Sequence, residues 1–238
     1  MKTIIGCLSI FLSLSAFAST KPASAVFSFE GTAYDITTND VLYTEHHKIT
    51  LNDRNNYETT AVTYMDSSGQ VFAQKSLDFT YNLMSPLVDF EDTRVGTSVK
   101  VIKHDNGLKV RYKSASDSAS AIIKAVPMMV VDAGFDQMLL QYWDVLIDKQ
   151  TLEFEFLAPT RAQLISFSLA SVFQDDAIIE LSLAPSNFFL RLLVDPIKLT
   201  YDKVTKRILI YEGLTNIEKT KQGEATGEYY IARIEYRY

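Results

Sequence analysis

Apolar and polar positions alternate along most of the chain, which divides it into short extended runs. In Leu152–Leu157, for example, Leu152, Phe154 and Phe156 alternate with two glutamates, as in a strand that buries one face. The runs are rich in Thr, Tyr, Val and Phe, and clusters of Asn, Asp, Ser and Gly separate them. This pattern predicts strands over residues 26–34, 41–51, 57–65, 71–81, 97–103, 108–112, 152–157, 163–173, 178–183, 197–201, 208–211 and 228–238.

The segments between these runs carry turn and loop signals. The pair Asn106-Gly107 is the strongest hairpin signal in the chain. Pro86 and the stretch Asp89–Gly96 predict a longer loop, and the Ser-rich stretch Ser114–Ser120 predicts another. The apolar stretch Asn187–Val194 fits either a short helix or a buried strand.

One stretch, Val130–Lys149, has the period of a helix instead of a strand. Asp132 stands where an N-cap is expected, and Asp136 follows in the first turn, where the helix dipole favours negative charge. We expect these two residues, with Asp144 and Asp148, to cap the helix or to lie on its solvated edge. The apolar side chains recur at i, i+3, i+4, i+7, i+8 and i+11 and form one face, which consists of Phe135, Met138, Leu139, Tyr142, Trp143 and Leu146.

Ten to twelve strands in succession predict an antiparallel sheet that must protect its edges and its concave face. Curling into an open or closed barrel is the usual solution at this number of strands. The apolar face of the helix needs a surface to cover, and the concave face of the sheet provides one. The predicted fold is therefore mainly β, with a curved antiparallel sheet and one central amphipathic helix packed on or in its concave face. Residues 19–238 are expected to form a single domain.

The first 18 residues have the pattern of a cleaved secretory signal peptide. Lys2 supplies positive charge, Ile4–Leu14 is an apolar run too short to span a membrane, and Ala16–Ala18 is a small-residue cleavage site. The single cysteine, Cys7, lies inside this segment. We therefore expect a mature protein without disulfides, which suits a bacterial periplasm better than a disulfide-rich secreted scaffold.

Charge and motifs exclude several classes of function. Loss of residues 1–18 would remove one lysine and no acid, so the net charge would change from −6 to −7. An acidic chain without a basic block is not expected to bind nucleic acid or anionic membrane surfaces. The sequence contains no HExxH, no GxSxG and no glycine-rich phosphate-binding loop, so no metal and no cofactor are expected.

Two neighbouring histidines, His46 and His47, lie on a predicted strand. Their side chains should point to opposite faces, so one metal ion cannot bind both. His47 shares a face with Glu45, which predicts a carboxylate–imidazole pair. This pair is the basis of one alternative, a periplasmic hydrolase that uses the Glu45/His47 face. A third histidine, His104, is expected to be solvated in a turn.

Three arginines, Arg94, Arg161 and Arg191, lie in partly apolar surroundings. A buried guanidinium group needs a carboxylate partner. Asp132 is a candidate partner for one of these three residues.

The overall plan resembles the open-barrel fold of the periplasmic lipoprotein carriers (LolA/LolB-like) and of related periplasmic families. Leu199–Leu214 (LTYDKVTKRILIYEGL) is similar to the strand–turn–strand units of that class. The resemblance covers most of residues 26–238 in the rhythm of its strands, and it carries no functional residue over by position. It implies an open barrel. The aromatic and Met-containing face of Val130–Lys149, packed toward a curved sheet, suggests that an apolar ligand lies between the sheet and the helix.

We therefore predict a non-enzymatic periplasmic protein that binds a lipid or another hydrophobic small molecule, with an envelope protein as a further partner. A second alternative is a small outer-membrane β-barrel, because the last predicted strand has Tyr230, Ala232, Ile234, Tyr236 and Tyr238 on one face. The residues expected to contact an apolar ligand lie on the helix and on the strand after it, and they are Phe135, Met138, Leu139, Tyr142, Trp143, Phe154 and Phe156.

Overall fold

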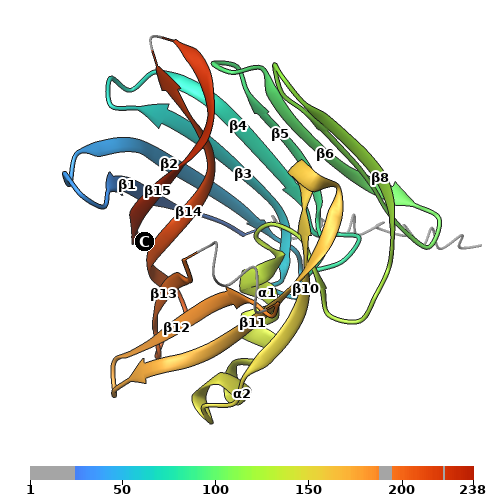
Figure 1. Cartoon of the computed structure of the whole chain (residues 1–238). Coiled ribbons are helices and arrows are strands. Elements are labelled where there is room, and N and C mark those ends of the chain that lie inside the picture. Colours follow the sequence, from blue (N-terminus) through green and yellow to red (C-terminus); the bar gives the residue numbers. More distant parts are fainter. Residues whose placement is uncertain (1–24, 188–194, 222) are drawn as a thin grey trace, which may run out of the picture.

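The structure is a computed structural model of the chain, and it describes residues 25–187, 195–221 and 223–238. One sheet of fifteen strands curves around an interior (Figure 1), so the prediction of a mainly β, curved sheet is confirmed. The predicted signal peptide, residues 1–18, lies outside the described residues. The strands are β1 (Val26–Asp35), β2 (Val41–Leu51), β3 (Tyr57–Asp66), β4 (Val71–Asp78), β5 (Leu87–Asp92), β6 (Thr97–His104), β7 (Gly107–Lys113), β8 (Ser118–Lys124), β9 (Met129–Val130), β10 (Leu152–Ala158), β11 (Gln163–Gln174), β12 (Ile178–Pro185), β13 (Ile197–Asp202), β14 (Ile208–Lys221) and β15 (Glu224–Arg237).

The strand order is β8-β7-β6-β5-β4-β3-β2-β1-β15-β14-β13-β12-β11-β10-β9. Every neighbouring pair is antiparallel except β9 and β10, which are parallel and flank the helical segment. The first and last strands pair in the middle of the sheet, from Glu30 opposite Arg237 to Asp35 opposite Ala232. The free edges of the sheet are consequently β8 and β9, which are consecutive in the chain.

The number of strands is larger than the predicted ten to twelve. The stretch Asp89–Gly96, predicted as a loop, contains most of β5. In this strand Val88, Phe90 and Asp92 are buried, while Asp89 and Glu91 face outward. The sequence did not indicate a strand here because the strand is short and its two outward residues are acidic, as in a loop. The edge strand β8 includes part of the predicted Ser-rich loop, and β9 ends at Val130, the first residue of the stretch predicted to be helical.

The predicted single helix is two shorter helices, α1 (Gly134–Gln141) and α2 (Trp143–Ile147), which are separated at Tyr142 (φ −108°, ψ 23°). The first helix begins late because Asp132 has a left-handed backbone conformation with φ 47°. Gly134 packs so closely on the loop between β4 and β5 that a Cβ atom would lie 2.0 Å from the carbonyl oxygen of Met84. The predicted Asp132 cap is wrong, because α1 has no side-chain cap.

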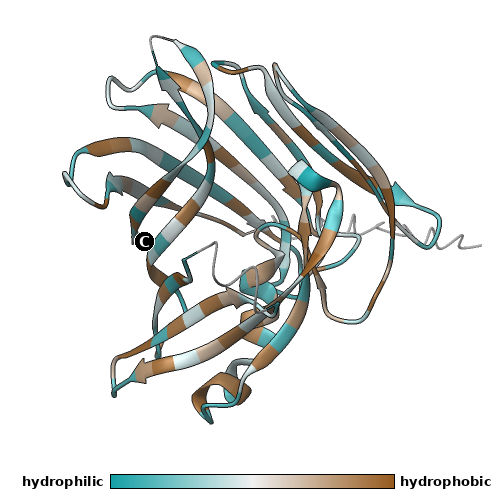
Figure 2. Cartoon of the chain, viewed as in Figure 1, coloured by the Kyte–Doolittle hydropathy of each residue, from teal (hydrophilic) through white to brown (hydrophobic). Residues whose placement is uncertain are grey.

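The apolar face predicted for the helix is nevertheless the face that is buried. Met138, Leu139, Trp143 and Leu146 pack with β10–β13 in one apolar cluster. A second apolar cluster packs on the inner face of the sheet, mainly on β1–β7, β14 and β15. Figure 2 shows the alternation of hydrophobic and hydrophilic residues along the strands, which allows each strand to bury one face.

The sheet has two halves, β1–β8 and β9–β15, which are called its wings below. Two contacts between elements that are not neighbours in the sheet bring these wings together. Arg94, which pairs with Asp92 through two hydrogen bonds of 2.6 and 3.1 Å, also donates to the carbonyl oxygen of Glu218 at 3.3 Å. The β14–β15 hairpin therefore reaches the turn between β5 and β6. On the other side, the 3-10 turn η1 (Pro159–Arg161) lies against β7 and β8. The sheet stays open, with β8 and β9 at its edges, although these distant elements touch.

Neighbouring leucines on α1 provide a test of this packing. Leu139 is 0% exposed and Leu140 is 39% exposed. We expect Leu139→Ala to lower the free energy of unfolding by about 2–5 kcal/mol and Leu140→Ala to change it by less than about 0.5 kcal/mol. Urea unfolding followed by the fluorescence of Trp143 would measure both variants. Equal losses would contradict the assigned orientation of the helix.

Candidate ligand-binding cavity

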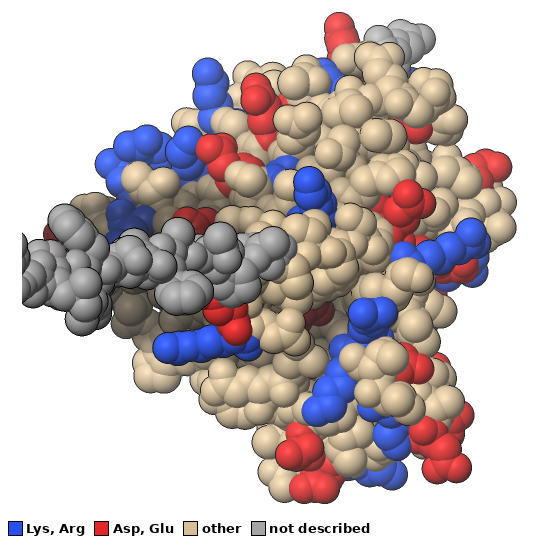
Figure 3. All heavy atoms as spheres, turned by 180° about the vertical axis from the view of Figure 1, so that it is seen from behind, with Lys and Arg blue, Asp and Glu red and all other residues tan. Residues whose placement is uncertain are grey.

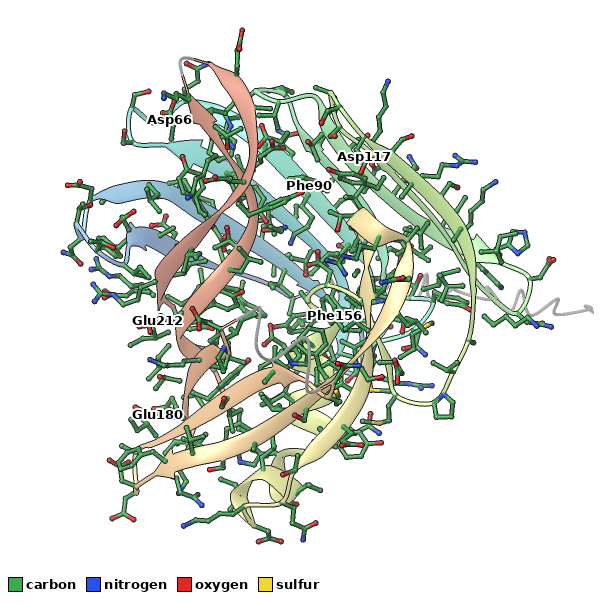
Figure 4. All side chains as sticks on the ribbon, viewed as in Figure 1. Asp66, Phe90, Asp117, Phe156, Glu180 and Glu212 are labelled. Carbon is green, nitrogen blue, oxygen red and sulfur yellow. The ribbon has the colours of Figure 1, made fainter. Side chains whose placement is uncertain are left out.

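A cavity of about 500 Å³ lies inside the curved sheet beside the N-terminal end of α1. Apolar and aromatic side chains from both wings of the sheet form most of its wall, and its size is typical of small-molecule sites. Figure 4 shows Phe90 of β5 and Phe156 of β10 inside the sheet, whereas Glu180 and Glu212 lie on its outside. Among the lining residues, Thr160 of η1 and Leu214 and Asn216 of β14 are exposed.

The predicted contact residues divide into two groups. Phe135, Phe154 and Phe156 line the cavity. The other four belong to the packing between the helices and β10–β13: Met138, Leu139 and Trp143 are buried there, and Tyr142 packs against them. The Trp143 ring lies edge-on to Tyr201 with 6.2 Å between centroids. The helix therefore contributes mainly to the core, and only its first turn faces the cavity.

An ion pair lies in the cavity wall where the sequence predicted a helix cap. Lys75 of β4 places its Nζ atom 2.8 Å from Oδ1 of Asp132, and its side chain is 11% exposed. Burial alone would lower the pKa of Lys75, but the Asp132 carboxylate, together with Tyr64 and Glu45, raises the pKa overall. The predicted contact of Asp132 with Arg94 is wrong, because Arg94 pairs with Asp92. Arg161 is exposed and Arg191 lies outside the described residues.

Asp136 also differs from the prediction, because it faces the cavity and not the solvated edge of a helix. The hydroxyl group of Tyr201 donates a hydrogen bond of 2.6 Å to Oδ1 of Asp136. Among the described residues, no lysine, arginine or histidine forms an ion pair with this carboxylate. Burial raises the pKa of Asp136, and the Tyr201 hydrogen bond and the charge of His47 only partly oppose this effect.

The predicted Glu45–His47 pair is confirmed, with 3.0 Å between Oε2 of Glu45 and Nε2 of His47. Both side chains line the cavity, and the ring of Phe29 stacks on the imidazole at a centroid distance of 4.3 Å. The neighbouring His46 points to the other face, where Nδ1 lies 3.0 Å from Glu30. In the part of the chain that the structure describes, no three potential metal ligands converge on one point.

These five residues, Glu45, His47, Lys75, Asp132 and Asp136, are called the ionic cluster below. They come from β2, β4, α1 and the turn before α1, and they line one cavity. The cavity thus combines an apolar, aromatic wall with a localised polar region. Such an arrangement can hold an amphiphilic molecule, because the apolar wall accepts its body and the polar region fixes its orientation.

No protein-family model, no curated protein and no solved structure matches this chain. None of the described helices is both long enough and apolar enough to cross a membrane. The resemblance to the LolA/LolB-like carriers therefore stays a prediction. Functional inference rests on the geometry and the chemistry of the cavity.

The raised pKa of Asp136 has a testable effect on stability. Between the usual aspartate pKa and the raised pKa, the folded state binds more protons than the unfolded state, so ionisation of Asp136 makes the stability of the wild-type protein fall as pH rises. Asp136→Asn removes this contribution. We expect the stability of the variant relative to wild type to increase as pH rises through this window, as measured by urea unfolding.

The matched control for this experiment is Asp144→Asn, which removes an exposed carboxyl group from α2. A difference between Asp136→Asn and wild type that stays constant from about pH 3.5 to pH 8 would contradict the burial of Asp136.

Proposed function

We propose that the chain is a non-enzymatic binding protein that holds a lipid or another molecule with an apolar body inside the curved sheet. The observation that carries this proposal is the cavity of about 500 Å³ beside α1. Protein interiors are ordinarily packed without voids much larger than a water molecule. The size of this space and the aromatic rings that line it support a binding site for such a molecule.

The periplasm is the proposed location, on the basis of the signal-peptide pattern in residues 1–18. The outward positions of the strands carry charged residues such as Lys48, Lys100 and Glu153. Figure 3 shows acidic and basic side chains interspersed on one face of the molecule. A lipid-facing band would be apolar, so we prefer a periplasmic protein to a small outer-membrane barrel. Release of the protein by osmotic shock would support this location.

A carrier role would fit the same site. An open sheet with helices beside its concave face agrees in plan with the LolA/LolB-like resemblance. An apolar chain held in the cavity of a carrier needs a partner in the envelope that delivers or accepts it. This partner is part of the proposal, and its identity would follow from that of the bound molecule.

A pair of Val→Trp substitutions tests the binding site. Val99 lines the cavity, whereas Val172 of β11 is 62% exposed. We expect Val99→Trp to fill the cavity and to weaken binding of decanol by at least about tenfold, a loss of 1.4 kcal/mol or more. Val172→Trp should bind decanol as the wild type does. Displacement of the neutral fluorophore N-phenyl-1-naphthylamine would report the affinity.

Two results would contradict the proposal. One is equal affinity of both variants for decanol. The other is a wild-type protein that binds neither the fluorophore nor decanol and that carries no lipid in mass spectra of its solvent extracts.

The Glu45–His47 pair supports a second candidate function, a hydrolase acting on a molecule in the cavity. A carboxylate 3.0 Å from an imidazole can orient that imidazole as a general base. If this alternative holds, the protein cleaves p-nitrophenyl decanoate and His47→Ala lowers the rate by about 100-fold or more. His46→Ala, on the outer face, is the matched control and should have no effect. Absence of ester cleavage by the wild-type protein would refute the hydrolase and leave the binding function intact.

A further inference from the structure

The charges around the cavity indicate which polar group its ligand carries. Three carboxyl groups of the ionic cluster, those of Glu45, Asp132 and Asp136, face the cavity with one lysine and one histidine. When all three are ionised, negative charge exceeds positive charge whichever protonation state His47 adopts. The lining tyrosines do not offset this excess, because they are uncharged at neutral pH.

The two cationic side chains of the cluster already have partners. Nζ of Lys75 lies 2.8 Å from Oδ1 of Asp132, and Nε2 of His47 lies 3.0 Å from Oε2 of Glu45. Asp136 forms no ion pair with a described residue, and it accepts a hydrogen bond from a neutral group, the hydroxyl of Tyr201. An anionic ligand would have to break one of the two pairs. A cationic ligand would instead supply the positively charged partner that Asp136 lacks among the described residues.

A second observation, independent of the carboxylates, also indicates a missing polar partner. Thr60 lies on the inner face of β3, lines the cavity and is 3% exposed. Its hydroxyl oxygen is buried and has no hydrogen-bond partner among the described residues. Buried polar groups without a partner are rare in folded proteins, and a bound polar molecule is one way to satisfy them.

The aromatic wall near Asp136 suits a positive charge. Tyr201 donates a hydrogen bond to this carboxylate. Burial raises the pKa of Tyr57 and that of Tyr236; the Asp136 charge adds to this rise at Tyr57, and Glu45, Tyr43 and Asp136 add to it at Tyr236. All three rings line the cavity. Aromatic faces attract ammonium groups, most strongly where water is excluded.

We propose that the ligand is a cationic amphiphile, with an apolar body against the aromatic wall and a protonated amine or other ammonium group at Asp136. This inference rests on the proposed binding function and names the chemical class of the ligand. The ammonium group donates hydrogen bonds to the Asp136 carboxylate and lies among tyrosine rings. Lys75 and His47 keep their carboxylate partners and disfavour a second cation elsewhere in the cavity.

Three ligands of equal chain length test the inference: decylamine, decanol and decanoate. We expect the wild-type protein to bind decylamine at least about tenfold more tightly than decanol, and decanoate at least about tenfold more weakly. Displacement of N-phenyl-1-naphthylamine below the micellar concentrations would give the three affinities. Measurements at about 0.5 M NaCl remove adsorption of the amine to the acidic surface, because salt screens exposed charges more than buried ones.

Asp136→Asn should abolish the preference for decylamine over decanol, so that the two ligands bind the variant with affinities within about twofold of each other. Asp144→Asn, which removes an exposed carboxylate, is the matched control and should keep the preference. The order of the three ligands on the wild-type protein tests the inference even if Asp136→Asn does not fold.

The outcomes separate the inference from the proposed function. Binding of decanol or decanoate as tightly as decylamine would overturn the cationic ligand and leave the binding function standing. A preference for decylamine that persists in Asp136→Asn would overturn the role of Asp136. Failure of all three ligands to bind would overturn the proposed function itself.

Discussion

The pairing of β1 with β15 is the constraint on which the rest of the structure depends. Six residue pairs join the two strands, from Glu30 with Arg237 to Asp35 with Ala232. At Gly31 the strands are so close that a Cβ atom would lie 2.8 Å from the ring of Tyr236. Because the first and last strands pair in the middle of the sheet, its two free edges are β8 and β9. The helical segment follows β9 in the chain, and it packs on β10–β13.

The two wings of the sheet differ in how their concave faces are used. The wing of β10–β13 is covered by α1 and α2, whose apolar faces form a closed cluster with it. The opposite wing contributes Glu45, His47 and Lys75 to the cavity beside this cluster. Burial of charged groups costs free energy unless they are paired and hydrogen-bonded. Retention of such groups around a cavity is typical of functional sites, and it is the physical basis for a polar end of the ligand.

Local sequence patterns predicted the structure correctly for most features that depend on a single strand or turn. Alternation identified most strands, and Asn106-Gly107 lies in the hairpin between β6 and β7 as predicted. The period of two also placed His46 and His47 on opposite faces. The same reasoning failed for β5, whose outward acids resemble those of a loop. It also failed for the start of the helix, where Asp132 has a left-handed conformation and is not the cap of α1, which begins at Gly134.

Which face of each segment is buried was therefore determined by the sequence alone, because it depends only on the period of apolar residues. What each buried polar group meets was decided by the tertiary structure. Lys75 and Asp132 are 57 residues apart, and Asp136 and Tyr201 are 65 apart. Only the curvature of the sheet brings these side chains into one cavity. The sequence around Asp132 and Asp136 is the same whether these side chains face solvent or, as here, meet Lys75 and Tyr201 from distant strands.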